Sequence, residues 1–238
     1  MSSEVNFLIK IVKEASLIIN EKLEVKAKGN NGDLVTNFDY EIENYLINKI
    51  KEKYPDYSII SEEYNSNKEL TDNCFTIDPI DGTVNFANNI PLWGIQIACI
   101  KNKETCASVI YLPKIDELYY ADSTGAYLNN KRIHVNNLDY NNGLYTIDGP
   151  RGVEIQTKMR DVSTHFRSFG SAAVNFSWVA SGKLGAVIFG YKTAWDYTPG
   201  MYLVKQAGGY TYNDDNIHIA ANSKEFLDIL KNITKQDN

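Results

Sequence analysis

The chain has 238 residues, of which 43% are hydrophobic and 23% are charged, and its formal net charge is -6. These values are typical of a globular protein that buries a substantial core, and they exclude disordered, fibrous and small disulfide-stapled classes. The acidic balance argues against nucleic acid as a partner, because binding to a phosphate backbone needs a basic stripe. No apolar run approaches the ~20 residues of a membrane span, so we expect no membrane partner.

The three cysteines of the chain are Cys74, Cys99 and Cys106, and they form no Cys-x-x-Cys pair. An odd number of such cysteines is typical of free thiols in a reducing compartment, so we expect a cytoplasmic protein. The N-terminal segment carries charged residues among its apolar ones, which argues against a cleaved leader. The three histidines show no spacing typical of metal binding or cysteine catalysis, so the thiols are expected to pack in the core.

The first element in chain order is a predicted amphipathic helix. Apolar residues recur at three- and four-residue spacing between positions 5 and 19, and Ser2 or Ser3 can cap the first turn. A loop rich in glycine and asparagine is expected from Lys28 to Asp33.

A capping-box pattern predicts the second helix. Thr36 is followed three residues later by Asp39, and apolar residues then recur at helical spacing from Ile42 to Ile50. The helix is expected to end at Tyr54, because the residue before a proline disfavours helical backbone. Taken by itself, Asp39 is therefore a helix cap.

Carboxylates follow the next two predicted strands. The apolar segment from Tyr57 to Ile60 runs into Glu62, and the segment from Cys74 to Ile77 runs into Asp78 and, shortly after, Asp81. Both segments have the length and composition of strands. If the two strands are neighbours, their ends present these carboxylates to one point.

The rest of the first half is expected to form an antiparallel sheet. Asn129-Asn130 has the composition of a hairpin turn. The segments that have the pattern of strands are 94–100, 107–112, 117–121 and 125–135.

Beyond about residue 136 the pattern changes to alternating helix and strand, which is typical of an α/β arrangement. The predicted strands are 167–169, 186–189, 210–212 and 218–220, and the predicted helices are 171–181, 195–206 and one that starts at 223. We expect an N-terminal half, 1–136, and a C-terminal half, 137–238, that share one compact body. A functional site is expected where the halves meet.

The most informative motif is the run from Asp78 to Phe86, which reads Asp-Pro-Ile-Asp-Gly-Thr-Val-Asn-Phe. Two ionised carboxylates ~4 Å apart repel by roughly 4 kcal/mol at an effective dielectric of 20, so a cation is expected between Asp78 and Asp81. The alternative is a polar turn at a strand end, because Asp-Pro and Asp-Gly are ordinary turn dipeptides.

Phosphate and Mg²⁺ suit this set of residues, since Mg²⁺ takes oxygen ligands from carboxylates, water and substrate phosphate. Gly82 and Thr83 can begin a helix whose first amides hold phosphate oxygens. The Thr83 hydroxyl can hydrogen-bond an attacking water if another group accepts the proton. Asp39 is the candidate for that group, and helix capping is its alternative role.

A haloacid dehalogenase-type phosphatase is a second interpretation of Asp-Gly-Thr after an apolar strand. In that class the spacing is Asp-x-Asp-Gly-Thr, but this chain has Asp-x-x-Asp-Gly-Thr. Because of this extra residue, Asp78 would point away from the position that the aspartyl nucleophile takes in haloacid dehalogenase-type enzymes.

Taken together, four separated blocks give the chain a resemblance to the inositol monophosphatase-like family of magnesium-dependent, lithium-sensitive phosphomonoesterases. The blocks are Asp33-Leu34-Val35-Thr36-Asn37-Phe38-Asp39, Ile60-Ser61-Glu62-Glu63, the run 78–86, and Trp195-Asp196 with Gln206-Ala207-Gly208-Gly209. The resemblance implies a layered αβαβα sandwich, shared with fructose-1,6-bisphosphatases, and a homodimer. It covers nearly the whole chain.

The resemblance also implies a set of metal ligands. Glu62, Asp78 and the backbone carbonyl of Ile80 would bind one Mg²⁺, and Asp78, Asp81 and Asp196 would bind a second. A third, looser ion would lie near Glu62, which gives two to three ions per site.

Roles in the reaction are implied in the same way. Thr83 and Asp39 would activate the nucleophilic water, and Asp81, Gly82 and Thr83 would contact the phosphate. Two further substrate-binding candidates, Arg167 and Ala172, come from the segment Arg167-Ser168-Phe169-Gly170-Ser171-Ala172-Ala173, which matches the family near the alcohol part of the substrate.

The substrate is expected to be an inositol monophosphate or a sugar phosphate. In animal-type members a glutamate seven residues before the Trp-Asp aspartate binds inositol hydroxyls, but this chain has Phe189 there. Fructose-1,6-bisphosphate, phosphoadenosine phosphate and histidinol phosphate are therefore alternative substrates. A non-catalytic protein that binds phosphorylated ligands is the alternative from another functional class.

Overall fold

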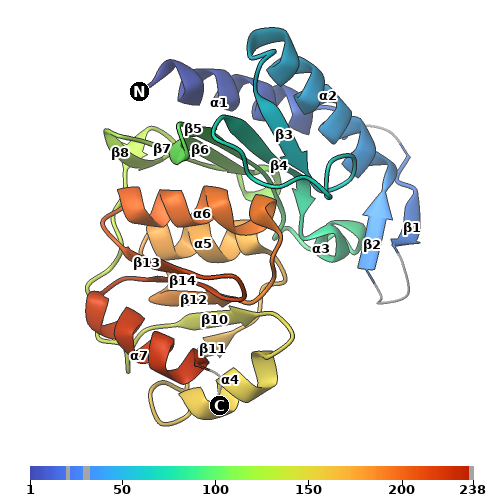
Figure 1. The fold of residues 1–238 in the computed structure, drawn as a ribbon. Helices are drawn as coiled ribbons and strands as arrows, with labels where there is room; N and C mark the ends of the chain where they lie inside the picture. Colours follow the sequence, from blue (N-terminus) through green and yellow to red (C-terminus); the bar gives the residue numbers. More distant parts are fainter. Residues whose placement is uncertain (20–21, 29–32, 236–238) are drawn as a thin grey trace.

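The computed structural model describes residues 1–19, 22–28 and 33–235. Helices and sheets alternate in layers: a helix pair, a large sheet, a second helix pair, a smaller sheet and a third helix pair (Figure 1). The predicted αβαβα sandwich is therefore confirmed. Among the described residues, every helix is too short or too polar to span a bilayer.

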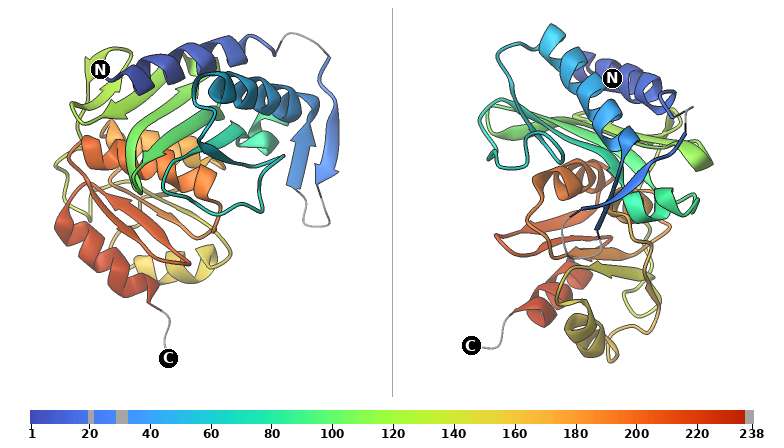
Figure 2. Two further views of the ribbon diagram at one scale, coloured as in Figure 1. Left: turned by 45° about the horizontal axis from the view of Figure 1, so that its top comes forward. Right: turned by 90° about the vertical axis from the view of Figure 1, so that its right-hand side faces the viewer.

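The larger sheet has seven strands in the order β3-β4-β5-β6-β7-β8-β9. Their bounds are β3 Ser58–Ser61, β4 Cys74–Asp81, β5 Gly94–Lys101, β6 Glu104–Leu112, β7 Glu117–Asp122, β8 Gly125–Leu128 and β9 Lys131–Arg132. Helices α1 (Ser3–Ser16) and α2 (Asn37–Lys53) cover its outer face (Figures 1 and 2). Their apolar stripes pack against the sheet in one buried core.

The expectation of an antiparallel first sheet is wrong for one pair, because β3 and β4 run parallel. The chain crosses back over residues 62–73 between them, so that both strands end at the same edge. All other neighbouring strands in this sheet are antiparallel. The predicted hairpin turn is confirmed: Asn129 and Asn130 have φ of 46° and 67°, as a type I′ turn requires.

The smaller sheet has five strands in the order β11-β10-β12-β14-β13. Their bounds are β10 Tyr145–Asp148, β11 Phe166–Arg167, β12 Ala186–Phe189, β13 Tyr210–Asn213 and β14 His218–Ala221. Helices α5 (Ala172–Ala180) and α6 (Ala194–Gln206) lie between the two sheets, and α4 (Gly152–Met159) and α7 (Lys224–Thr234) cover the outer face (Figure 1). Because α5 meets protein on both sides, all but one of its residues are buried.

Several elements were not predicted. The hairpin of β1 (Val25–Lys28) and β2 (Asp33–Thr36) stands beside α2 and α3 (Thr83–Ala87) (Figure 2). Its first strand is mostly exposed and lacks apolar alternation, which removes the usual signal. The loop expected from Lys28 to Asp33 includes residues 29–32, which lie outside the described residues.

The other elements missed are β10, α4 and the short 3₁₀ helix Pro113–Ile115. The first helix also ends at Ser16, short of the expected residue 19, and residues 133–135 do not continue a strand. The three cysteines are free. The predicted boundary near residue 136 falls between β9 and β10, and the division into halves stays a prediction.

Candidate functional site

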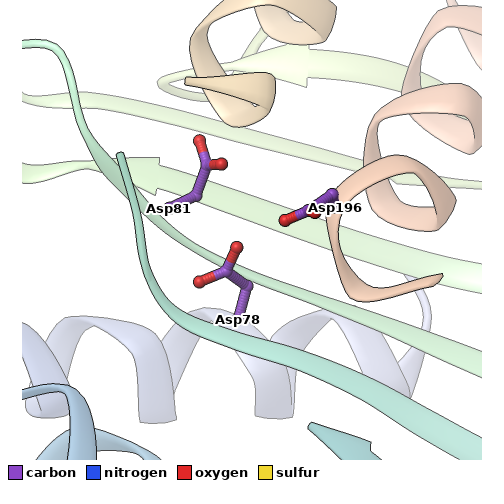
Figure 3. Close-up of side chains that lie close together, drawn as sticks. All are labelled: Asp78, Asp81 and Asp196. Atoms are coloured by element: carbon purple, nitrogen blue, oxygen red, sulfur yellow. The ribbon is translucent and has the colours of Figure 1, made fainter. Parts of the chain in front are cut away.

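Strand β4 brings two carboxylates to one side of the sheet end. Asp78 and Asp81 are three residues apart, so regular alternation would point them to opposite faces. The pairing of β4 with β5 shifts register between these residues, and the irregularity turns both side chains toward the first turn of α6. Asp196 projects from that turn (Figure 3). The three carboxylates offer oxygen atoms within 4.8 Å of one another.

The N-terminus of α5 holds the Asp81 carboxylate. The backbone N–H groups of Ala172 and Ala173 donate to it at 3.1 and 2.8 Å, and the Ser171 hydroxyl donates as well. Ser171 is the N-cap of α5, so the positive end of the helix faces the carboxylate. These donors fix the orientation of Asp81.

The other two carboxylates are oriented by fewer donors. Asp78 accepts hydrogen bonds from the Ile80 N–H at 3.1 Å and the Gln96 amide at 3.3 Å. Asp196 accepts a hydrogen bond from the Thr193 hydroxyl.

Burial raises the pKa of Asp78, Asp81 and Asp196, and repulsion between the acidic groups adds to the effect on Asp78 and Asp196. A bound cation would offset both effects, which is the behaviour expected of metal ligands.

Glu62 lies just beyond the end of β3, as the two-strand prediction requires, and it lines the same cleft as Asp81 and Asp196. It is not one of the three carboxylates that meet within 4.8 Å. Its Oε1 accepts from Lys28 Nζ at 2.9 Å, and burial raises its pKa. Lys28 also contacts Glu63, so one ammonium group offsets part of the charge of two carboxylates at the rim of the site.

Thr83 and Asp39 are in contact. The Thr83 Oγ1 lies 3.3 Å from Asp39 Oδ1 and 2.9 Å from the Ile80 carbonyl, so its single proton can be donated to either oxygen. The Asp39 Oδ2 accepts from the Thr36 N–H at 2.7 Å and from its hydroxyl, which is the predicted capping box. Asp39 is fully buried, and burial raises its pKa to about 7. One oxygen therefore caps α2 and the other faces Thr83.

Gly82 occupies a left-handed turn, with φ of 87°, immediately before α3. A Cβ there would lie 3.1 Å from the Ser171 Cβ and 3.2 Å from two backbone oxygens, so the turn needs glycine for both conformation and space.

Of the two predicted residues near the alcohol part of the substrate, Ala172 lines the cleft. Arg167 is exposed, is not part of the lining, and donates its guanidinium to the Phe166 carbonyl. The structure thus does not bring it to the other predicted residues.

The cleft has a volume of about 340 Å³ and also contains residues that the sequence analysis missed. Asp148 and Tyr191 line it, next to Phe189.

The sequence analysis also missed a fully buried glutamate behind the site, Glu43. It accepts hydrogen bonds from the backbone N–H groups of Glu63 and Tyr64 at 2.8 Å each and so fixes the turn that carries Glu62. A charged residue in the apolar stripe of α2, one turn after Asp39, was the available signal for Glu43.

Comparison with known proteins gives one family. The model described as the inositol monophosphatase family matches residues 2–224. A "Fructose-1,6-bisphosphatase/inositol-1-monophosphatase" of Thermotoga maritima is 31% identical, over 85% of this chain and 80% of that protein. A Xylella fastidiosa protein named "Nus factor SuhB" is 34% identical, over 87% of this chain and 80% of its own. Among solved structures, the IMPase of Thermotoga maritima superimposes with a TM-score of 0.86 at 26% identity, and 98% of each chain is covered.

Proposed function

The chain belongs to the inositol monophosphatase family, and on this premise we propose that it is a Mg²⁺-dependent phosphatase of inositol monophosphates or sugar phosphates. Family membership supports hydrolysis of phosphate monoesters in general. The observation that carries the proposal is the meeting of Asp78, Asp81 and Asp196 within 4.8 Å, at a cleft that Asp81, Asp196 and Glu62 line. This donor set consists only of carboxylates, which Mg²⁺ prefers.

The residues fit a divalent cation, because two buried carboxylates and the half-buried Asp196 repel one another, and a cation offsets that repulsion. Asp78, Asp81 and Asp196 would hold one ion, and Glu62, Asp78 and the Ile80 carbonyl would hold another. When bound, the metal supplies positive charge that offsets the charge on the phosphoryl oxygens and on the leaving alkoxide. The number of ions, the lithium sensitivity and the homodimer that the resemblance implies stay predictions.

Thr83 and Asp39 would handle the proton of the attacking water. The Thr83 hydroxyl accepts a hydrogen bond from the water while it donates its own proton to Asp39 Oδ1, which lies 3.3 Å away. Asp39 has no exposed surface, so it acts through Thr83 rather than by touching the water. A pKa near 7 suits a group that takes up a proton at neutral pH.

The left-handed turn at Gly82 would receive the phosphate. It presents the first backbone amides of α3, which have no partner within the helix, beside the carboxylates that would hold the metal. The absence of a Cβ at Gly82 lets this turn pack against Ser171, a donor to Asp81.

A phosphate-release panel tests this proposal. Inositol 1-phosphate, fructose 1,6-bisphosphate, phosphoadenosine phosphate and histidinol phosphate are incubated with Mg²⁺ and, in parallel, with excess chelator. We expect the protein to release phosphate from inositol 1-phosphate or from fructose 1,6-bisphosphate with Mg²⁺, and we expect this activity to disappear in excess chelator. Full turnover in chelator would contradict the metal assignment, and binding of Mg²⁺ and sugar phosphates without turnover would favour a non-catalytic binding protein.

A further inference from the structure

Phe189 contributes no polar atom to the cleft. Its side chain is only 3% exposed and packs in the core between the two sheets, with its ring near Phe176 and Tyr191. A hydroxyl group of a substrate therefore needs another partner in this part of the cleft. The neighbouring strand provides a carboxylate.

Asp148 is the last residue of β10, and it is the direct partner of Phe189 in the parallel pairing of β10 with β12. Paired residues project from the same face of a sheet. Ile147 and Ile188 face the outer layer of α4 and α7, so Asp148 and Phe189 face the inner layer of α5 and α6. The carboxylate therefore emerges beside the position that Phe189 leaves without a polar group, and it lines the cleft.

Helix α5 holds Asp148 in place. The fully buried Asn175 donates its side-chain amide to Asp148 Oδ2. Asn175 lies three residues after Ala172, or about 4.5 Å along the helix axis, and Ala172 is one of the donors to Asp81. One short helix thus orients a carboxylate of the acidic cluster, Asp81, and a second carboxylate of the cleft lining, Asp148.

Asp148 has capacity for another donor. In the part of the chain that the structure describes, Asn175 is the only group that hydrogen-bonds its carboxylate. An ionised carboxylate only accepts hydrogen bonds, and it repels phosphate oxygens. A sugar or polyol hydroxyl is a neutral donor that can fill this capacity, and it brings no charge that the carboxylate would repel.

We propose that Asp148, positioned by Asn175, binds a hydroxyl on the alcohol part of the substrate in place of residue 189. This inference rests on the proposed phosphatase function and narrows its substrates to phosphate esters of polyols or sugars with a free hydroxyl near the ester. A simple aryl phosphate gains nothing from Asp148.

Two substrates and two variants test the assignment. Kinetics of wild type, Asp148→Ala and Asp148→Asn are measured with inositol 1-phosphate and with p-nitrophenyl phosphate, which has no alcohol hydroxyl. For Asp148→Ala we expect KM for inositol 1-phosphate to rise about 10-fold or more, as loss of a hydrogen bond to a charged group implies, and kcat/KM for p-nitrophenyl phosphate to stay within about twofold. Asp148→Asn keeps the shape and one acceptor oxygen, so a smaller increase is expected.

Asp228→Asn is the matched control, since Asp228 is an exposed carboxylate of α7 and does not line the cleft. This variant should leave the ratio of kcat/KM for inositol 1-phosphate to kcat/KM for p-nitrophenyl phosphate unchanged. Equal effects of Asp148→Ala on both substrates, or none on either, would overturn the role of Asp148 and leave the phosphatase proposal intact.

Calorimetry separates the two proposals further. Binding of inositol 1-phosphate in the presence of Mg²⁺ is compared between wild type and Asp148→Ala, each in an Asp39→Asn background that slows turnover. At least about 10-fold weaker binding supports the role of Asp148, and equal affinity contradicts it. A wild-type protein that releases no phosphate from any ester would defeat the phosphatase proposal, and this binding comparison would still decide on Asp148.

Discussion

The acidic cluster of Asp78, Asp81 and Asp196 differs from the strand-end pair of Asp148 and Phe189 in how the chain builds it. Two members of the cluster, Asp78 and Asp81, come from the last four residues of β4, and Asp81 accepts hydrogen bonds from three donors. The strand-end pair comes from two strands that only the register of a parallel sheet brings together. Asp148 has a single donor.

This difference follows from what each region has to bind. Several charges must be concentrated at the metal and phosphate, so the residues need close spacing and firm orientation, and part of that spacing appears in the sequence as a motif. Recognition of an alcohol needs only a few acceptors at the right distance from the phosphate. Such acceptors can be supplied by different strands of one sheet, so residue 189 can become apolar while a neighbouring strand provides the carboxylate.

Asp196→Asn should give the largest effect, because it removes one charge from the acidic cluster without changing its shape. We expect kcat/KM to fall at least about 10²-fold for every substrate, or ~3 kcal/mol of transition-state stabilisation, with an unchanged circular dichroism spectrum. Asp228→Asn, on the exposed surface of α7, is the matched control and should have no effect. A folded Asp196→Asn protein with wild-type rates would remove Asp196 from the reaction.

The sequence predicted the acidic cluster better than the rest of the cleft, for a physical reason. Asp78, Asp81 and Thr83 lie within six residues, and the strand before them is a continuous apolar run. Asp196 follows a tryptophan at a helix start, which would be an ordinary cap without the other blocks. The helices other than α4 and the 3₁₀ helix could also be predicted, because their apolar spacing and caps are local signals in the sequence.

The sequence could not predict which distant strands pair, or in what register. The strand β10 is four residues long, and neither it nor its partner shows which residue will face Phe189. The parallel pairing of β3 with β4 was missed for the same reason, although the meeting of their ends was expected. Arg167 was placed near the substrate by a local match to the family; its side chain donates to the Phe166 carbonyl and lies outside the cleft lining, and its role stays a prediction.

Gly82→Ala, compared with Gly208→Ala, tests how firmly the phosphate turn is built. Both glycines have nearly the same left-handed φ, 87° and 86°, and each substitution should cost about 1–2 kcal/mol of unfolding free energy. A Cβ at Gly208 would meet nothing within 4 Å, but one at Gly82 would crowd Ser171, a donor to Asp81. We therefore expect the greater loss of stability for Gly82→Ala, and about a 10-fold or larger loss of kcat/KM for that variant alone. Urea unfolding and steady-state kinetics measure both, and equal changes in the two variants would show that crowding at the turn has no consequence.

The smallest expected effect is the change with pH in the unfolding free energy of Asp148→Asn relative to wild type. Burial raises the pKa of Asp148 from 3.8 to about 6, so its ionised form is disfavoured in the native state. Well below pH 3.8 the group is protonated in both states and has no such effect; the penalty grows as the pH rises from about 4 to about 6 and is complete above that, at roughly 3 kcal/mol. Asp148→Asn should therefore be more stable than wild type at neutral pH, and its advantage should grow by about 1 kcal/mol between pH 5 and pH 7.5.

Urea unfolding in chelator at these two pH values measures that advantage without a contribution from bound metal. Asp228→Asn, which removes an exposed carboxylate, controls for the change in net charge. A difference between Asp148→Asn and wild type that stays constant from pH 5 to pH 7.5 would contradict the raised pKa. A growing difference, together with the kinetic loss on inositol 1-phosphate, would show that the chain keeps a destabilising carboxylate because the substrate uses it.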